Sequence, residues 1–426
     1  MFVLIVMLLS ICRLKNFSLY IGLSIFLIFG FPSYLTLSYG FNIQKIIAVI
    51  FLIELLVIFL GNFKINVVKI PIAIFIFALA MSSWLVSSVF SDAYQGVLVR
   101  ALAQIVLYFG VFAYLNYHFR QGSLTVDILC KSLIAAFILN FPVAIYEQFS
   151  RIPVSNILMA YFGSQTEGWG FILKEKFRLV GYRSQGFMVH PLAYALLSMV
   201  AYISAITVIR NSNKSVNLKL LFFVTAFLIF AYSIFISGSR SGLGAFLVIT
   251  LFLSTYRNLT IQKLSVLLSL LSILCFYLLF SDFKLLTKLV ELATGSGEFS
   301  ALSNSNAVRF QQYSEAYAAL NSSILVGHGV DSSIHFTEFG TMDNFWLSWM
   351  VNYGLIGMIT LFVIIGFKMI YVKNIVTENR KFFYSIGLTF LCFSPILSLS
   401  YLTLILFLFL SIEGKNIRVN RLESSR

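Results

Sequence analysis

Long apolar segments, separated by short polar connections, run through almost the whole chain, and they constrain its fold more than any motif does. Of the 426 residues, 59% are hydrophobic and 11% are charged, whereas soluble domains carry about 25% charged residues. An apolar segment of about 20 residues is long enough to cross a bilayer as a helix. The sequence therefore predicts an all-α polytopic membrane protein, in which residues 1–426 form a single transmembrane domain.

The apolar segments predict about twelve transmembrane helices. The first residues, Met1 to Cys12, are too short to cross the membrane, so we expect an interfacial or poorly defined start. Proline breaks helices, and Ser394-Pro395 therefore separates the last two spans. The expected spans are Phe17–Leu37, Ile43–Leu60, Ile70–Phe90, Val97–Tyr117, Val126–Phe149, Val189–Ile209, Leu220–Ile236, Leu243–Tyr256, Leu264–Phe280, Phe345–Ile370, Phe382–Ser394 and Ile396–Ile412.

Lysine and arginine residues lie in alternate connections, and this asymmetry predicts the orientation because basic loops stay cytoplasmic. It places both termini in the cytoplasm. The long loops Ser150–Met188 and Ser281–Asp343, and the connection Ser237–Gly242, then lie on the outer face. The net charge of +14 could indicate a nucleic-acid partner, but basic residues at the ends of apolar segments indicate a lipid bilayer instead.

The second long loop is expected to be partly helical. Residues Asp282–Ala293 have apolar side chains on one face and predict an amphipathic helix. A polar linker through Ser303–Asn306 leads to a second predicted helix, Ala307–Leu320. Gly327-His-Gly329 then turns the chain back toward the membrane. Four residues of the second helix share one face: Arg309, Tyr313, Ala316 and Leu320.

The signatures of soluble enzymes are missing from the sequence. It contains no Walker loop, no cluster of histidine and cysteine ligands and no Asp-x-Asp pair for a metal-bound nucleotide sugar. Gly327-x-Gly329-x-x-Ser332 has the glycine spacing of a phosphate loop but lacks the strand-to-helix context. The cysteines occur singly within apolar segments, so we interpret them as core residues. They are Cys12, Cys130, Cys275 and Cys392. No cofactor or metal is expected.

Arg240 interrupts a long apolar stretch and lies among Ser237, Ser239, Ser241 and nearby glycines. A cation at the edge of a span is costly and usually faces a polar cavity, often at a functional site. Glycines let a ligand approach the backbone closely, and serine hydroxyls can satisfy helix ends. The alternative interpretation is a tight turn whose arginine extends to the lipid headgroups.

Further arginines are expected on the outer face with Arg240, namely Arg100, Arg178, Arg183 and Arg309. The arginine fork suits phosphate oxygens and keeps its proton, so two or three converging arginines could hold a pyrophosphate without a metal. Each could instead be a solvated loop charge or the ion-pair partner of a nearby glutamate. We favour that alternative for Arg178 and the phosphate role for Arg309, and both remain open for Arg183.

Several residues on the outer side could act as an acid or a base. They are Glu147, His190, His328, His335, Glu338 and Asp343. Asp343 is placed best, because it lies where the second long loop re-enters the membrane. Asp343 or Asn344 could also cap the following helix, and capping is compatible with catalysis. His190 precedes Pro191 and opens a span in the same way. Glu54 lies within a span far from the outer face, so we expect a helix-packing hydrogen bond there.

Five segments, in this order and spacing, resemble the bacterial O-antigen ligase and O-antigen polymerase superfamily. The resemblance covers residues 178–357, whereas the first five spans match only in hydropathy. The last segment is similar to the family's His-Asn-x-x-Leu and Gly-x-x-Gly pattern, but it has Asp343 where the family has histidine. The segments are Gly181–Pro191, Ser237-Gly-Ser-Arg-Ser-Gly242, Ala307-Val-Arg-Phe-Gln-Gln-Tyr-Ser-Glu-Ala316, Ile324-Leu-Val-Gly-His-Gly329 and Asp343–Gly357.

The resemblance implies a membrane glycosyltransferase of the GT-C type that acts on undecaprenyl-diphosphate-linked oligosaccharides at the outer leaflet of the bacterial inner membrane. The family's two functional arginines correspond to Arg240 and Arg309, and its histidine corresponds to Asp343. The aspartate favours a polymerase over a ligase that passes finished glycan to lipid A-core. Around these catalytic residues we expect substrate to be bound by Arg100, Arg183, Ser239, Ser241, Tyr313, His335 and Asn344.

A polymerase of this kind implies a flippase and a chain-length regulator of the same pathway as partners. The chain itself could instead be a transporter or flippase for lipid-linked oligosaccharides. Transporters place polar features and broken helices near the midplane of the membrane, between repeats. Here the charges gather on the outer face and no internal repeat is visible. The sequence therefore favours the glycosyltransferase.

Overall fold

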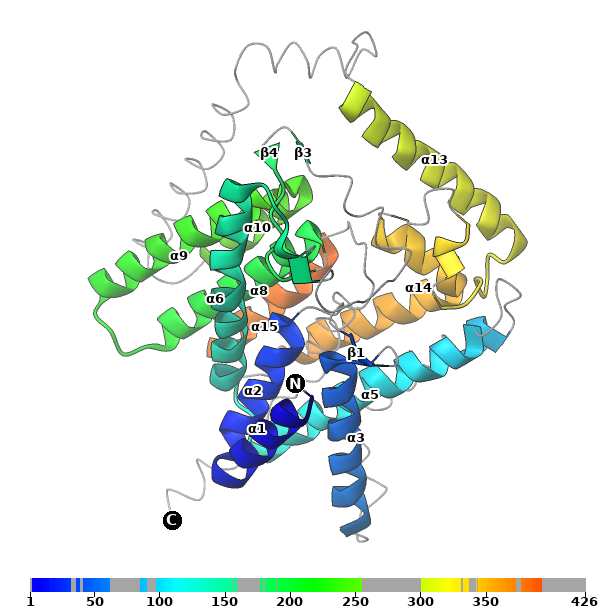
Figure 1. Cartoon of the computed structure of the whole chain (residues 1–426). Coiled ribbons are helices and arrows are strands. Elements are labelled where there is room, and N and C mark those ends of the chain that lie inside the picture. Colours follow the sequence, from blue (N-terminus) through cyan, green and yellow to red (C-terminus); the bar gives the residue numbers. More distant parts are fainter. Residues whose placement is uncertain are drawn as a thin grey trace, which may run out of the picture.

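The protein is almost entirely helical in a computed structural model that describes residues 2–31, 36–38, 41–61, 85–89, 97–155, 157–158, 177–178, 181–188, 190–254, 300–330, 332–336, 342, 344–372 and 377–392 (Figure 1). The helices are α1 (Phe2–Lys15), α2 (Phe17–Gly30), α3 (Ile43–Gly61), α5 (Val97–Gln121), α6 (Val126–Ser150), α8 (Pro191–Asn211), α9 (Val216–Ile236), α10 (Arg240–Ser254), α13 (Ser300–Ser322), α14 (Phe345–Val372) and α15 (Thr377–Cys392). The prediction of an all-α polytopic membrane protein is confirmed.

Five helices in the described ranges are long and apolar enough to cross a membrane. They are α5, α6, α8, α9 and the Phe345–Val363 part of α14. Two shorter apolar helical segments, Phe17–Gly30 and Gly242–Leu253, coincide with two more of the expected spans. The expected spans Leu264–Phe280 and Ile396–Ile412, and the expected helix Asp282–Ala293, lie outside the described residues. Of the span Ile70–Phe90, the structure describes only a helical piece at residues 85–89.

Three expectations about helix boundaries are wrong, and one of them, the start of α10, is described with the candidate site below. The span Phe17–Leu37 ends at Gly30, and Thr36–Ser38 forms strand β1, which pairs antiparallel with β2 (Phe41–Asn42). Phe31 precedes Pro32 and is extended, because a residue before proline avoids the helical region. The expected polar linker Ser303–Asn306 is helical and belongs to α13, since no glycine or proline interrupts the segment.

The remaining regular structure is short and lies in the two long loops. Strands β3 (Phe177–Arg178) and β4 (Gly181–Tyr182) form an antiparallel pair in the first loop. A 3₁₀ turn, η3 (Ser332–Ile334), follows α13. The expected helix Ala307–Leu320 is confirmed within α13, and the expected turn at Gly327 and Gly329 is confirmed by their positive φ angles of 75° and 92°.

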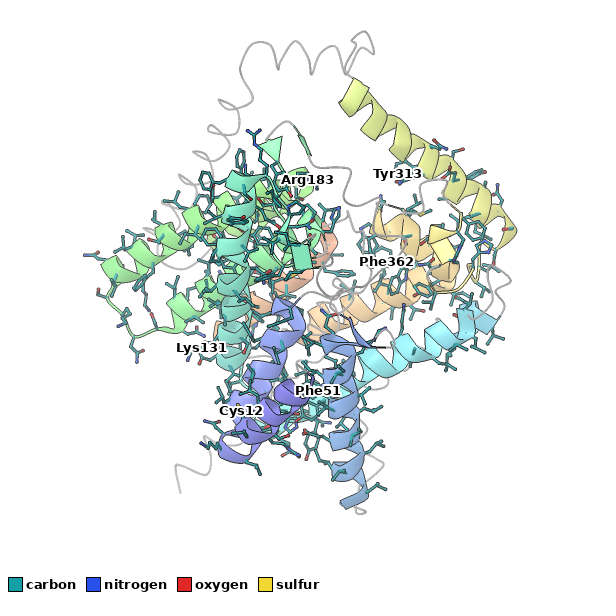
Figure 2. The ribbon with its side chains drawn as sticks, viewed as in Figure 1. Cys12, Phe51, Lys131, Arg183, Tyr313 and Phe362 are labelled. Atoms are coloured by element: carbon teal, nitrogen blue, oxygen red, sulfur yellow. The ribbon has the colours of Figure 1, made fainter. Side chains whose placement is uncertain are left out.

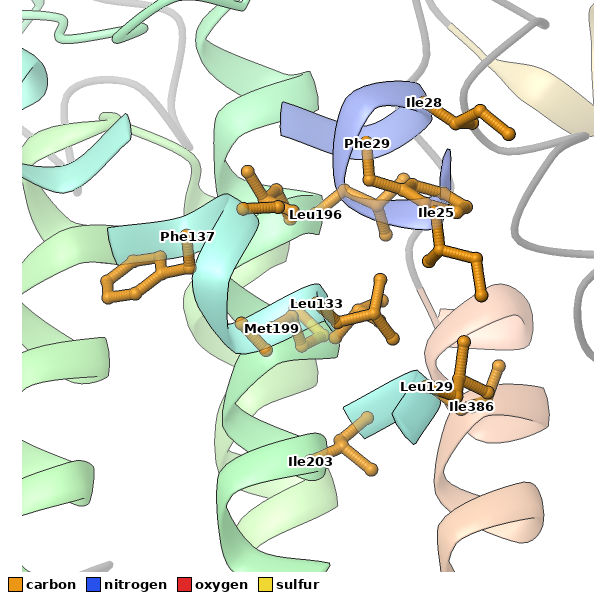
Figure 3. Close-up of a cluster of buried hydrophobic side chains, with 14 of the residues drawn as sticks. Ile25, Ile28, Phe29, Leu129, Leu133, Phe137, Leu196, Met199, Ile203 and Ile386 are labelled. Carbon is orange, nitrogen blue, oxygen red and sulfur yellow. The ribbon is translucent and has the colours of Figure 1, made fainter. Parts of the chain in front are cut away.

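The core forms where α6 packs between α2 and α8, while α8 also packs against α9 and α15. Figure 3 shows this layer, in which Ile25, Leu133 and Met199 come together from α2, α6 and α8. In lipid, helices associate through close packing and hydrogen bonds between helices. Ser198 of α8 and Ser233 of α9 make such a bond with their hydroxyls 2.8 Å apart.

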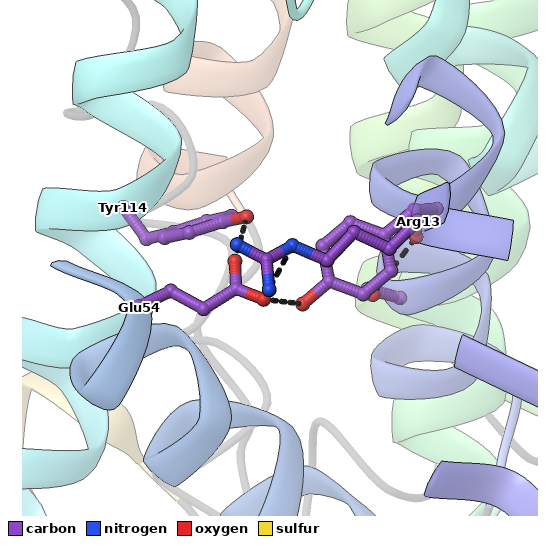
Figure 4. Close-up of polar contacts among 5 residues, drawn as sticks. Arg13, Glu54 and Tyr114 are labelled. Atoms are coloured by element: carbon purple, nitrogen blue, oxygen red, sulfur yellow. Dashed lines mark hydrogen bonds and ion pairs between the residues drawn. The ribbon is translucent and has the colours of Figure 1, made fainter. Parts of the chain in front are cut away.

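A buried carboxylate joins the first helices of the chain. Glu54 of α3 is 8% exposed, and its carboxylate accepts hydrogen bonds from the hydroxyls of Tyr20 (3.0 Å) and Tyr114 (2.5 Å), on α2 and α5 (Figure 4). The Nε atom of Arg13, on α1, lies 3.2 Å from the same carboxylate. Buried charges must be paired and hydrogen-bonded to be tolerated, and this one is. The expected helix-packing role of Glu54 is therefore confirmed.

Candidate functional site

The turn between α9 and α10 is shorter than the sequence suggests, because helix α10 begins at Arg240 and not at Leu243. Gly238 has a φ of 65°, a left-handed conformation that a side chain would strain. The Ser239 hydroxyl accepts a hydrogen bond of 3.0 Å from the Gly242 N–H and so caps the helix. Arg240 thus becomes the first residue of α10. The side chains of Arg240 and Ser241 lie outside the described part of the chain.

Arg183 supports this turn from the first long loop (Figure 2). Its side chain is buried, with 4% of the residue exposed, and its Nε donates to the Ser237 carbonyl at 3.2 Å. The Ser184 N–H donates to the Ile236 carbonyl at 3.0 Å. A Cβ atom on Gly238 would lie 3.0 Å from the Arg183 side chain, so the two segments are in close contact. The Nε bond to a backbone carbonyl gives Arg183 a role in holding the turn that presents Arg240.

Glu147, near the end of α6, anchors the segment that contains Arg183. Its carboxylate is fully buried and accepts three backbone N–H bonds, from Gln185 (2.7 Å), Gly186 (2.8 Å) and Val154 (2.8 Å). Burial, and then the charge of Glu147, raises the pKa of Tyr182 above its ordinary value. Through these bonds Glu147 anchors the backbone of the loop. From the sequence, Glu147 was instead a candidate acid or base.

Asn140, two turns earlier on α6, fixes the other end of the same segment. Its amide oxygen accepts from the Phe187 N–H at 3.0 Å, and its amide nitrogen donates to the Gly30 carbonyl at 3.0 Å. His190 then caps α8, since its Nδ1 accepts from the Leu192 N–H at 3.1 Å. The possible capping role of His190 is therefore confirmed.

Asn344 caps α14, where the second long loop re-enters the membrane. Its amide oxygen accepts from the N–H groups of Trp346 (3.0 Å) and Leu347 (3.3 Å). Its amide nitrogen donates to the Tyr313 hydroxyl, 3.2 Å away on α13. Asp343 lies outside the described residues, but it directly precedes this cap. Of the two residues expected to cap the helix, Asn344 makes the capping bonds.

Arg309 lies one helical turn before Tyr313 on α13, although its own side chain is outside the described part. Tyr313 is 47% exposed. Because residues four apart on a helix share one face, the Tyr313–Asn344 bond brings the Arg309 side of α13 toward the start of α14. The candidate residues Arg309, Tyr313, Asp343 and Asn344 therefore belong to one part of the fold.

The loop after α13 is locked to α14 at a break in that helix. Gly354 has φ 63° and ψ −166°, and the segment at residues 324–329 runs antiparallel to residues 351–356. The N–H groups of His328 and Gly329 donate to the carbonyls of Val351 (2.9 Å) and Asn352 (2.8 Å). A Cβ on Gly354 would lie 2.4 Å from a backbone oxygen, so only glycine fits there. This lock fixes how α13 stands relative to α14.

The two histidines of this loop differ in their surroundings. The Nε2 atom of His328 lies 2.8 Å from the Ala319 carbonyl, at the end of α13, which gives this ring a helix-capping contact. His335 follows η3 on the exposed surface, where its N–H donates to the Ser332 carbonyl at 2.8 Å. Ser333 and Ser348 join η3 to α14 through hydroxyls 2.8 Å apart.

The candidate residues form two groups, one at the start of α10 and one between α13 and α14. Figure 1 shows α13 set apart from α10. Helix α15 packs against both α10 and α14 and is their common support. The rings of Phe252 and Tyr384, and of Phe345 and Phe390, mark these contacts. Arg100 lies on α5, in the first turn of that helix, and its side chain is not among those described.

Metal ligands do not gather anywhere in the described parts of the chain: no three His, Cys, Asp or Glu side chains there are grouped to hold an ion. The contacts that organise the site come from residues that the sequence gave no reason to group, chiefly Asn140, Glu147 and Asn352. The Asn352 amide oxygen accepts from the Ser333 N–H at 2.7 Å. The sequence feature that could have indicated these contacts is the nearby glycines, such as Gly186, which has a φ of 60°.

We expect Glu147→Leu to lower the free energy of unfolding by about 3 kcal/mol or more, because three buried N–H groups would lose their acceptor at about 1 kcal/mol or more each. Glu147→Gln keeps one carbonyl oxygen, so its free energy of unfolding should lie between those of Glu147→Leu and the parent. Thermal unfolding in detergent measures the effect, with Phe149→Leu at a 79% exposed position of the same helix as control. Equal unfolding temperatures for Glu147→Leu and the parent would contradict the anchoring role.

Comparison with known proteins bears directly on these two groups. Residues 224–362 match the family model described as O-Antigen ligase. A search of curated proteins found no match. The matched range includes Arg240, Arg309 and the Asp343–Asn344 start of α14. Over residues 224–362 the chain is therefore similar to the O-antigen ligase family, which supports the superfamily that its sequence motifs resemble.

Proposed function

We propose that this protein is a polysaccharide polymerase that joins undecaprenyl-diphosphate-linked repeat units at the outer face of the bacterial inner membrane. The family match supports glycosyl transfer of the ligase or polymerase type. The observation that carries the choice of polymerase is Asp343, which stands where the family pattern has histidine. Asn344 makes capping bonds of α14, so the cap does not by itself require the Asp343 carboxylate.

In the proposed reaction, a sugar hydroxyl of the incoming unit attacks the anomeric carbon of the growing chain. The bond between that carbon and the diphosphate oxygen breaks, and undecaprenyl diphosphate leaves with the bonding electrons. The hydroxyl proton passes to the Asp343 carboxylate as a general base. Negative charge grows on the leaving diphosphate, so cations placed beforehand lower the barrier.

Arg240 and Arg309 are the proposed cations. Arg240 is the first residue of α10, where the N–H groups and the helix dipole also favour an anion. Arg183 and Glu147 contribute indirectly, because they hold the turn from which α10 starts. The contact of Tyr313 with Asn344 supports a role for Arg309, which lies one helical turn before Tyr313. Arg100 and His335 are proposed to bind substrate on the strength of their sequence positions.

The ligase is the second candidate, and one observation favours it: the matched family model is described as O-Antigen ligase. A ligase would pass finished glycan to lipid A-core and not to another repeat unit. The glycan attached to the lipid A-core distinguishes a ligase from a polymerase. A strain without this protein should retain single repeat units there if it is a polymerase, and should carry none if it is the ligase.

The arginine fork predicts a strict requirement at both positions. Arg240→Lys keeps the charge but loses the bidentate geometry, so it should sharply reduce long chains, and Arg309→Ala should leave single repeat units on the lipid A-core. The glycan ladder on a gel, normalised to membrane protein abundance, measures this. Arg178→Lys serves as the control, since a loop charge tolerates the change. If either variant gives the full ladder of chain lengths, that arginine has only a structural role and does not bind the diphosphate.

Separate roles for the two neighbours at the start of α14 predict opposite behaviour in two assays. Asp343→Asn should reduce long-chain product about a hundredfold, the usual value of a general base, with no loss of stability. Asn344→Ala should lower the free energy of unfolding by about 1 kcal/mol through loss of the cap. Thermal unfolding and the glycan ladder are measured on both. If Asp343→Asn gives the same glycan ladder as the parent, Asp343 is not the general base, and His335 and Glu338 become the candidates.

The proposed orientation can be tested with single cysteines at exposed positions, in a background without the native cysteines. A cysteine at Asn321, in the last turn of α13, should react with an impermeant maleimide in spheroplasts. A cysteine at Ser215, which precedes α9, should react only after permeabilisation. The reverse labelling would place the site in the cytoplasm and overturn the proposed substrate.

A further inference from the structure

We propose that α13 carries a saccharide-binding ridge, formed by Tyr313, Tyr317 and Asn321, along which the glycan of the substrate lies. The three residues follow at every fourth position and therefore share one strip of the helix surface. Tyr313 is 47% exposed and Tyr317 is 69% exposed. The ridge begins one turn after Arg309. The inference rests on the proposed function and adds the subsite that holds the sugar chain.

The ridge is separate from the face by which α13 packs. Ala316, Ala319 and Leu320 are buried and form a cluster with Met342 and Val351, which joins α13 to α14. Within residues 311–322 the helix thus buries Ala316, Ala319 and Leu320 and leaves both of its tyrosines exposed. Two exposed tyrosines on one strip form a continuous aromatic surface, and tyrosine is enriched where proteins bind their ligands and partners.

Tyr313, the first residue of the ridge, is held in place by Asn344 at the start of α14 (Figure 2). Its hydroxyl accepts a hydrogen bond of 3.2 Å from the Asn344 amide, while about half of its surface stays exposed. A ring fixed in this way loses little further freedom when it binds a ligand. The ridge therefore starts beside the residue that follows Asp343 and runs away from it.

The chemistry of the ridge fits a neutral sugar chain. The face of a tyrosine ring carries partial negative charge and packs against the C–H face of a sugar, while hydroxyl and amide groups bond to sugar hydroxyls. The other exposed residues from 313 to 322 are Ser314, Ala318 and Ser322, all of them uncharged, while Glu315 is half-buried and accepts a hydrogen bond from Gln311. Phosphate groups or a nucleic acid would require basic side chains there. Successive ridge positions are about 6 Å apart along the helix, a spacing comparable to one sugar residue.

The test uses the full-length protein and the surface polysaccharide of the host strain, freed of lipid by mild acid. Tyr317→Ala should weaken binding roughly fivefold to tenfold, the size expected for loss of an aromatic contact. Tyr317→Trp should bind at least as well as the parent. Tyr232→Ala, at an exposed tyrosine of α9, is the matched control and should not change binding. In cells, Tyr317→Ala should shorten the chains but retain formation of the first linkage.

The outcomes separate this inference from the proposed function. Equal binding by Tyr317→Ala and the parent, or no binding by the parent, would overturn the ridge and leave the arginine results untouched. A full ladder from Arg309→Ala would overturn the function even if the ridge bound glycan. A changed oligomeric state of Tyr317→Ala in solution would make the ridge a contact between copies of the chain and would also overturn the inference.

Discussion

The carboxylate of Glu147 is the contact on which the geometry around α10 depends. Where the chain leaves a helix near the membrane, its backbone N–H groups lose their helical partners and need other acceptors. Glu147 supplies three such bonds at once and is fully buried. A hydrogen bond contributes about 1 kcal/mol, so three bonds to one side chain are together strong enough to hold a loop. Arg183 passes the restraint to the Ser237 carbonyl, one turn before Arg240.

In the second group of candidate residues, between α13 and α14, backbone groups that lack helical partners are again hydrogen-bonded from elsewhere in the chain. At the break in α14, the backbone of residues 351–356 bonds to the loop at residues 324–329. The Asn352 amide oxygen accepts from both the Ser332 hydroxyl and the Ser333 N–H. Asn344 satisfies the first turn of α14 and also reaches Tyr313. In both cases, groups from elsewhere in the chain replace the lost backbone partners: the Glu147 carboxylate in the first case, and the loop at residues 324–329 in the second.

The sequence was sufficient for features that depend on local pattern. Hydropathy alone located α3, α5, α6, α8 and α9 to within a few residues, because a bilayer selects for segment length. The role of Glu54 also followed, since a carboxylate inside a span must find a hydrogen bond. The early end of α2 was readable as well, because Pro32 follows Phe31. The apolar segment continues past this proline to Leu37, and its hydropathy therefore predicts a helix longer than α2.

The sequence could not reveal contacts that depend on which distant segments meet. Glu147 and Gln185 are 38 positions apart, and Asn344 and Tyr313 are 31 apart. Nothing in the pattern around Glu147 separates an anchor from an acid or base, since both need a buried carboxylate. The start of α10 was missed for a different reason. Hydropathy detects the first apolar residue, Leu243, whereas the helix begins at the cap made by Ser239.

The placement of the cap matters most at the start of α14. A carboxylate that capped this helix would be stabilised by its N–H groups and would be a weaker base, because hydrogen bonds to the charged form lower a pKa. Asn344 takes the N–H groups of Trp346 and Leu347 instead. A neutral amide, and not a carboxylate, therefore accepts from these N–H groups. The same amide holds Tyr313, so one side chain both caps α14 and orients the helix that carries the proposed cation, Arg309.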